Sequence, residues 1–448
     1  MKKILSLVLA LCMLLGVASF ASAEEELPSF DKIVIGENTD LTAKIHFAYH
    51  RTDLGGEDGK LAGYVKQFKE IYPNIDIEYE LITDYAENAL LRVGNTDWTI
   101  MGIPAVDQDE LANYFIPLGD LETMSGLYNF VSAKAYNGVC YGIPSTGGAN
   151  GLVYNKRIFA EAGITELPKT PDEFIAALKA VKEKTDAIPL YTNYAAGWTM
   201  GAWDDYISGC ATGSATFMNQ DILHMKDPFS NRGDGTGPYA VYKILYDAVK
   251  EGLIEDDYTT TDWEGCKPMM NNGQIATLVL GSWAYTQMRD AIGGNHPEDV
   301  GYMAFPITVN GKQYAPAGGD YNFGINVKAS HEEKLASLYY LKWLTHESGF
   351  AYSEGGVPIN KGGEMPDLYA AFDGIEMLEQ APAVAGEETL LNELNSESEL
   401  NINNGGNIKV QSIVEHAFNG DMEFDDIMAS WNEAWSEAQE SLGVEVNK

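Results

Sequence analysis

The residues best suited to chemistry are not arranged in a recognisable catalytic pattern. The 448-residue sequence contains no GxSxG, SxxK, HExxH or P-loop motif. It has only seven histidines, so we expect no metal site and no cofactor. A glycoside hydrolase needs two placed carboxylates, and a chain with 66 acidic residues could always supply a pair. That enzyme class stays open, although no motif supports it.

Aromatic and polar residues instead suggest a binding site. Several tryptophans follow strands or lie in glycine-flanked loops, and polar groups occur in "HRTD" and "GGDYNFG". Flat rings suit the C–H faces of a sugar, and forked polar groups suit its hydroxyl pairs. Each of these residues could instead pack in the core, face solvent or form a structural ion pair without touching a ligand. The candidate ligand-binding residues are Arg51, Asp53, Trp198, Trp203, Trp283, Asp320, Tyr321 and Asn322.

Short strands and helices alternate along the chain and must position these residues. Residues 43–49, 75–82, 98–103, 188–191 and 275–280 have the patterns of strands. Capping boxes at Thr170–Glu173 and Ser330–Glu333 open helices expected to end near residues 184 and 346. Helices are also expected over 61–72 and 239–251, and a final one carries an apolar stripe from Phe424 to Leu442. This alternation predicts an α/β fold, in which ligands collect beyond the carboxyl ends of strands.

The first residues indicate export. Lys2 and Lys3 precede an apolar run, and Ala21-Ser22-Ala23 is a small-x-small cleavage site, so residues 1–23 are expected to be a signal peptide cleaved after Ala23. An uncleaved anchor is disfavoured because the run is shorter than a spanning helix. Residues 24–42 are acidic and irregular and are interpreted as a tether. The protein is expected outside the cytoplasm: at the cell surface, in the periplasm or secreted.

The net charge and the cysteine content limit the possible functions and folds further. The formal net charge is −37, and removing two lysines with the signal peptide makes it −39. Nucleic-acid binding is therefore disfavoured, because it requires a basic surface. Three cysteines remain after cleavage, so either Cys210 and Cys266 form one bridge or all the thiols are free. The mature chain exceeds one core and should divide into two lobes.

One connector is unusual in length and composition. Between apolar runs at 139–143 and 152–155 the chain passes through Pro-Ser-Thr-Gly-Gly-Ala-Asn-Gly. This is too long for a tight hairpin and too short for a helical crossover. Such a segment of small residues is suited to bending.

The order of several blocks resembles the extracellular solute-binding proteins of carbohydrate ABC importers, the large family that includes maltose-binding protein. The blocks are "FKEIYPNIDIEYE", "NGVCYGIPSTGGANGLVYNKRIFAEAGI" followed by "PKTPDEF", "NNGQIATLVLGSWAY", "INVKASHEEKLASLYYLKWLTHESG" and "EGGVPIN". The resemblance implies a two-lobed type II binding-protein fold with ligand trapped by hinge closure. It implies that residues 43–146 and 281–345 form the first lobe. Residues 147–280 and 346–448 would form the second. Ser145, Thr146, Gly147 and Gly148 would form one hinge crossing.

The resemblance also implies the site and the function. Trp283 matches the family's Gly-x-Trp ligand aromatic, and Trp198 and Trp203 fall where the second lobe supplies a stacking platform. We expect a monomeric, non-enzymatic receptor that passes a sugar or oligosaccharide to the membrane subunits of an ABC permease. Another small solute, such as a polyamine, is the alternative within the binding class. An exported glycan-degrading enzyme is the alternative outside it.

Overall fold

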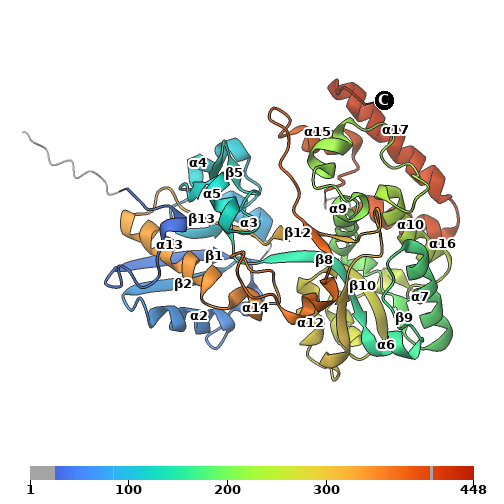
Figure 1. Ribbon diagram of the computed structural model, residues 1–448, viewed down its shortest axis with the longest axis horizontal. Coiled ribbons are helices and arrows are strands. Elements are labelled where there is room, and N and C mark those ends of the chain that lie inside the picture. The colour runs from blue at the N-terminus through green and yellow to red at the C-terminus, as the bar shows by residue number, and fades with distance from the viewer. Residues whose placement is uncertain (1–25, 84, 404–406, 448) are drawn as a thin grey trace, which may run out of the picture.

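The computed structural model describes residues 26–83, 85–403 and 407–447 and has two lobes joined by extended segments (Figure 1). The expected signal peptide and its cleavage site therefore lie outside the described residues. The described chain has no helix long and apolar enough to span a membrane.

The first lobe is built on a five-stranded sheet. Its order is β2 (Ile75–Leu81), β1 (Ala43–Tyr49), β3 (Ile100–Gly102), β13 (Asn322–Ile325) and β7 (Ile143–Pro144). Strands β1, β2 and β3 are parallel, so the loops after them meet at one edge. Helices α2 (Lys60–Lys69) and α13 (His331–His346) pack beside this sheet. The predicted capping box opens α13, since Ser330 and Glu333 exchange side-chain and backbone hydrogen bonds.

The second lobe is built on a six-stranded sheet. Its order is β14 (Glu376–Leu378), β12 (Tyr314–Gly319), β8 (Gly147–Asn155), β10 (Ile275–Gly281) and β9 (Ile188–Leu190), with β11 (Val300–Met303) also paired to β8. Every residue of β10 is buried, which explains its largely apolar sequence; the hydroxyl of its one polar residue, Thr277, donates to the Pro189 carbonyl at 2.6 Å. The surrounding helices include α6 (Lys156–Glu161), α7 (Pro171–Lys184), α10 (Gly237–Lys250), α15 (Leu390–Ser398), α16 (Asn407–Asn419) and α17 (Phe424–Leu442).

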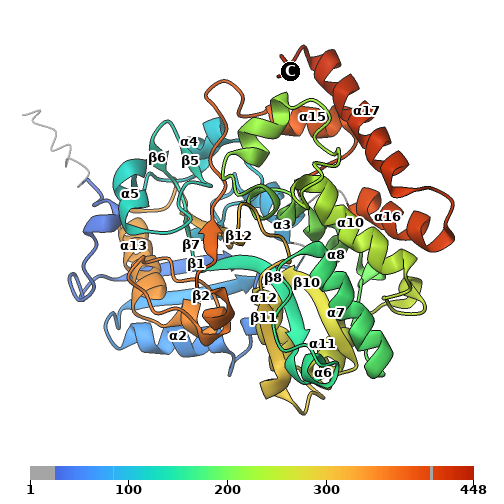
Figure 2. The same cartoon turned by 45° about the vertical axis from the view of Figure 1, so that its right-hand side comes forward.

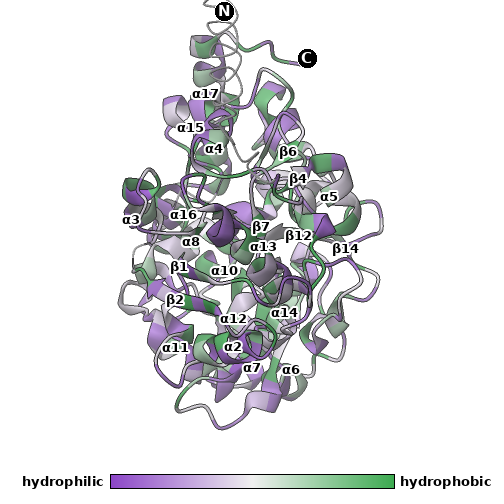
Figure 3. Ribbon diagram, turned by 90° about the vertical axis from the view of Figure 1, so that its left-hand side faces the viewer, coloured by the Kyte–Doolittle hydropathy of each residue, from purple (hydrophilic) through white to green (hydrophobic). Residues whose placement is uncertain are grey.

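The predicted stripe on the last helix forms part of the second lobe's core. Hydrophilic and hydrophobic residues are mixed along α17 (Figure 3). The residues from Phe424 to Ala438 in the predicted stripe are all buried, whereas Leu442 is exposed. The helix thus presents one apolar face to the lobe.

Strand pairing corrects part of the expected division into lobes. Residues 281–319 were expected in the first lobe, but β11 and β12 both pair antiparallel with β8. The chain after β10 forms α12 (Trp283–Arg289) and returns to the same sheet before it crosses to the first lobe. A Gly-x-Trp strand ending cannot reveal this return, because it depends on long-range pairing.

The proposed tether is also partly wrong. Residues Phe30–Lys32 form a short helix, and the Phe30 and Ile33 side chains are buried. The Phe30 amide donates to the Leu118 carbonyl at 2.7 Å. Burying these two apolar side chains fixes this part of residues 24–42 against the first lobe.

Paired segments of the described chain run between the lobes. Figure 2 shows β8 passing from the first-lobe side into the second sheet. Beside it, Gly147, Gly148 and Ala149 pair with Gly319, Gly318 and Ala317 of β12. Val357 lies beside these strands, and its amide and carbonyl exchange hydrogen bonds of 2.8 Å with Gly147. The connector interpreted as a bending segment is therefore paired strand from Gly147 onward.

Gly147 is expected to tolerate no side chain. A Cβ atom there would lie 2.0 Å from Cε2 of the buried Phe130 ring, whereas at Gly318 no atom lies within 4 Å. Gly147→Ala should lower the free energy of unfolding by about 1–3 kcal/mol. Denaturant unfolding without ligand measures this, and Gly318→Ala is the matched control. Equal stability of the two variants would contradict the packing described.

Of the two cysteine arrangements expected, the structure has free thiols. Cys140, Cys210 and Cys266 are all buried and unbridged. Buried free cysteine packs as a small apolar residue. Within the described residues, no cluster of histidine, cysteine and carboxylate side chains could hold a metal ion.

Candidate ligand-binding cleft

A cavity of about 530 Å³ lies where the crossings meet both lobes. Its volume falls in the range of small-molecule sites. It is lined by His50, Arg51, Thr146, Gly147, Gly148, Asn150, Ser282, Trp283, Thr286, Gln287, Gly318, Gly319, Asp320, Glu354, Gly355 and Gly356. Glycines make up much of its floor, so backbone can approach a ligand closely.

The cavity lining includes Trp283, which belongs to a cluster of three indoles that we call the aromatic wall. Trp283 is 42% exposed and Trp198 is 46% exposed, which is unusual for such large apolar rings. Their ring centroids are 5.8 Å apart, and the ring of Trp263, at the start of α11 (Trp263–Asn271), lies 5.3 and 5.7 Å from them. The three indoles brace one another and leave ring surface open to a partner with apolar faces.

Gly281 explains how Trp283 reaches this position. Strand β10 ends at Gly281, and α12 begins two residues later. A Cβ atom on Gly281 would lie 2.7 Å from Nε1 of Trp283 and 2.8 Å from Oδ1 of Asn150. The absence of a side chain therefore allows the indole to fold back beside Asn150 over the strand end.

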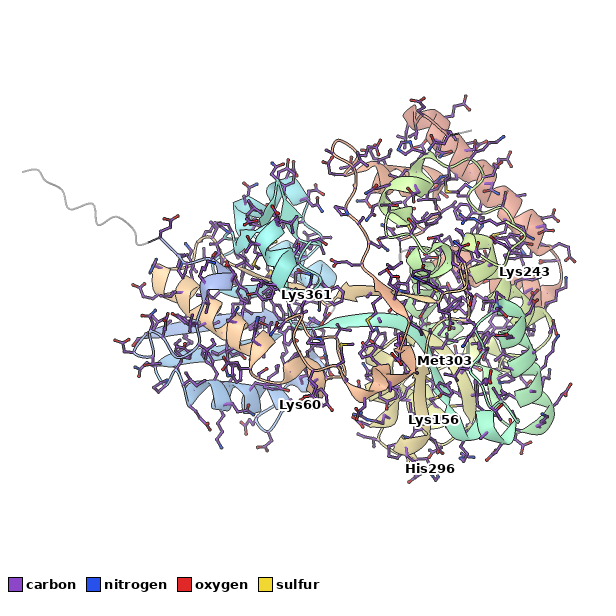
Figure 4. The ribbon with its side chains drawn as sticks, in the orientation of Figure 1. Lys60, Lys156, Lys243, His296, Met303 and Lys361 are labelled. Atoms are coloured by element: carbon purple, nitrogen blue, oxygen red, sulfur yellow. The ribbon has the colours of Figure 1, made fainter. Side chains whose placement is uncertain are left out.

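The opposite wall is charged but internally paired. The guanidinium of Arg51 donates two 2.8 Å hydrogen bonds to Asp53 and one of 3.0 Å to Glu354. Lys60 also donates to Glu354, at 2.7 Å, from the edge of the first lobe nearest the second (Figure 4). Burial opposes the charge of Arg51, but the hydrogen bond and charge of Asp53 keep its pKa above the ordinary value. The Arg51 guanidinium is thus fixed in direction by its hydrogen bonds to Asp53 and Glu354.

Asp320 stands at the same edge of the cleft. His50 Nε2 lies 3.1 Å from its carboxylate. Burial alone would raise the pKa of Asp320, but the hydrogen bond and charge of His50 lower it below the ordinary value. The backbone amide of Asp320 donates to the Thr146 carbonyl at 2.9 Å, which ties this loop to the crossing.

The structure brings together some of the predicted site residues. Arg51, Asp320, Trp283 and the hinge residues Thr146, Gly147 and Gly148 line the cavity. Trp198 extends its aromatic wall. Ser145 is fully buried beneath the crossing. The hinge role of these four crossing residues stays a prediction, because it concerns motion.

Other predicted residues lie behind the cavity. Asp53 orients Arg51, and the half-buried ring of Tyr321 packs 4.7 Å from that of His50 and 5.0 Å from that of Tyr85. The side chain of Asn322 is buried and reaches the Asp320 carbonyl at 3.4 Å. These residues hold the lining groups in position.

Trp203 does not belong to the aromatic wall. It is 2% exposed and packs edge-on against Phe305, 5.8 Å away, in the core of the second lobe. The prediction of a ligand contact at Trp203 is therefore contradicted by its burial. Sequence reasoning also missed Glu354, His50 and Trp263 as members of the site, although "HRTD" and the loop tryptophans pointed to their neighbourhoods.

A second cavity adjoins the first. It has a volume of about 400 Å³ and shares Asn150, Gly318 and Gly319 with the first cavity. Its remaining lining comes from both lobes and from the segment between β14 and α15: Gln108, Ser132, Ala133, Asp205, Asn219, Pro316, Ala317, Glu379, Gln380, Pro382, Ala383 and Glu388. The cleft thus has two compartments on either side of the shared crossing.

Comparison with known proteins assigns the chain to a family. The sequence profile of the bacterial extracellular solute-binding protein family matches residues 54–349. The chain belongs to this family. It has the family's two-lobed type II α/β fold, as the resemblance implied.

Individual relatives agree with this assignment. The multiple sugar-binding protein of Streptococcus mutans is 25% identical over 67% of this chain and 72% of its own length. The manno-oligosaccharide-specific solute-binding protein BlMnBP2 of Bifidobacterium animalis subsp. lactis, in complex with mannotriose, is 48% identical over 92% of this chain and 99% of its own, with a TM-score of 0.85. BlMnBP1 of the same organism, an ABC-transporter binding protein in complex with mannobiose, is 49% identical over the same shares, also with a TM-score of 0.85.

Proposed function

We propose that this solute-binding protein captures an oligosaccharide, of the mannose-based class, between its lobes and delivers it to an ABC permease. The observation that carries the proposal is Trp283, a partly exposed indole that lines the cavity beside polar crossing residues and is braced by Trp198 and Trp263. Sugars offer C–H faces to rings and hydroxyls to polar groups. Two solved structures that bind mannobiose or mannotriose, at 49% and 48% identity, support the choice of sugar.

The polyamine alternative fits the cavity less well. In the first compartment the lining carboxylates are Asp320 and Glu354; Glu354 is already paired with Arg51 and Lys60, and Asp320 already contacts His50. A cationic ligand would have to compete with these pairs. We propose that the protein is a receptor without enzymatic activity, since the family and its neighbours are binding proteins.

The proposal also states that the protein is exported, is a monomer and docks on a permease. The family is described as extracellular, and the sequence of residues 1–23 has the pattern of a signal peptide cleaved after Ala23. Closure of the two lobes would present one combined surface to the permease. Mass analysis of the secreted protein tests both the cleavage position and the monomeric state.

Isothermal titration calorimetry with mannobiose, mannotriose and a panel of other saccharides tests the function. We expect saturable one-to-one binding, strongest for a mannose-based ligand. Spermidine in the same assay represents the alternative. Binding of spermidine with no heat from any saccharide would overturn the proposal.

A further inference from the structure

The second compartment of the cleft contains a pair of polar side chains at its junction with the first. Asn150 Nδ2 donates to Asp205 Oδ2 at 2.9 Å. Asn150 lies in β8 opposite Gly281, beside the indole of Trp283, and lines both cavities. Asp205 lines the second cavity alone. The pair therefore links the aromatic wall to the second compartment.

Surrounding groups fix Asp205 in place. It belongs to a short helical segment, Ala202–Tyr206, whose Asp204 is buried and receives hydrogen bonds of 2.6 and 2.7 Å from Lys409 and one of 2.7 Å from Tyr242. On its other side, the hydroxyl of Tyr206 donates to the Gly151 carbonyl at 2.6 Å. Asp205 remains partly accessible, on the cavity side. It is thus a pre-positioned acceptor rather than a loose surface carboxylate.

We propose that Asn150 and Asp205 recognise the second sugar unit of a ligand that spans both compartments, which makes the protein selective for chains of two or more units. The proposal rests on the proposed function. Each compartment alone has the volume of a small-molecule site, so a single sugar unit would leave one of them unfilled. A hydroxyl of the second unit donates to the Asp205 carboxylate, and Asn150 Oδ1 accepts another.

Titration of Asp205 supplies an independent readout. Burial and the neighbouring charge of Asp204 raise the pKa of Asp205 to about 7, against the effect of the Asn150 hydrogen bond. The other titratable groups around it are Lys409, Tyr206, Tyr242, Tyr302 and Cys210, with Glu379 and Glu388 across the cavity. Donation from a sugar hydroxyl favours the charged carboxylate and lowers its pKa. Binding near pH 7 should therefore release protons, and affinity should rise from pH 6 to pH 8.

Calorimetry of Asp205→Asn with mannose, mannobiose and mannotriose tests the proposal. A lost hydrogen bond to a charged group corresponds to about a 10- to 150-fold loss of affinity. We expect that loss for mannobiose and mannotriose, but not for mannose. The advantage of mannobiose over mannose should therefore collapse in the variant. Titrations in buffers of different ionisation enthalpy should show proton release in the wild type and a smaller release in Asp205→Asn.

Two further variants complete the design. Asp247→Asn, on α10 and paired with Lys243, removes the same charge away from the cleft and should leave affinity and proton release unchanged. Asn150→Ser serves if Asp205→Asn does not fold; because Asn150 lines both compartments, it should weaken mannose binding as well, but mannobiose binding more, so that the advantage of mannobiose falls. If the wild type binds mannobiose more tightly than mannose and the variants keep the same ratio of affinities, this inference alone is overturned. A wild type that binds no saccharide overturns the proposed function as well.

Discussion

Replacing Trp283 by alanine is expected to weaken oligosaccharide binding by about 30-fold or more, the loss typical of a central aromatic contact worth at least 2 kcal/mol. The indole is 42% exposed at the cavity wall, so a sugar face can cover its open surface. Its removal also takes away the ring that braces Trp198 and Trp263. Calorimetric titration with mannobiose measures the loss.

Phe418→Ala provides the matched control for Trp283. Phe418 is 53% exposed on α16 and packs against Tyr258, and it lines neither cavity. Its replacement should leave sugar affinity unchanged. If Trp283→Ala folds, as judged by its thermal transition, and binds mannobiose as tightly as the wild type, the aromatic wall is not the sugar platform.

Lys409→Met is expected to lower the free energy of unfolding by about 3–5 kcal/mol. Lys409 donates to both oxygens of Asp204, and both side chains are buried. Removing the ammonium takes two hydrogen bonds and the opposite charge away from a buried carboxylate, so the desolvation cost of that charge is less well compensated. The same change loosens the segment that carries Asp205, so sugar affinity should fall along with stability.

Denaturant unfolding with a matched lysine variant checks this prediction. Lys44 pairs with Glu78 on the surface of β1 and β2, where both side chains are more than half exposed. Lys44→Met should change the unfolding midpoint far less than Lys409→Met does. Similar midpoints for the two variants would contradict the assigned role of the buried pair.

Local patterns predicted several of the longer strands and helices in the structure. The strand at 43–49 and the helices opened by Thr170 and Ser330 are found where the pattern of alternation and capping places them. Such signals are carried by residues a few positions apart, so they survive without knowledge of the fold. The cleft residues Arg51 and Trp283 could be predicted because each closely follows a predicted strand, and Asp320 because its segment closely precedes one.

The errors have long-range causes. Trp198 and Trp203 occupy consecutive short helical segments, and five residues along a helix rotate the side chain by about 140°, so the two rings face different surroundings. Only the fold shows that Trp198 faces the cleft and Trp203 the core. Glu354 joins Arg51 and Lys60 across about 300 residues, and the return of 281–319 to β8 depends on pairing. No local pattern encodes these contacts.

Small-angle X-ray scattering with and without saturating mannotriose tests the central claim most directly. The claim is that the two lobes close over a sugar held against the indoles of the second lobe. The account predicts a smaller radius of gyration in the presence of mannotriose, at a concentration that calorimetry shows to be saturating. Superimposable scattering curves under those conditions would contradict it.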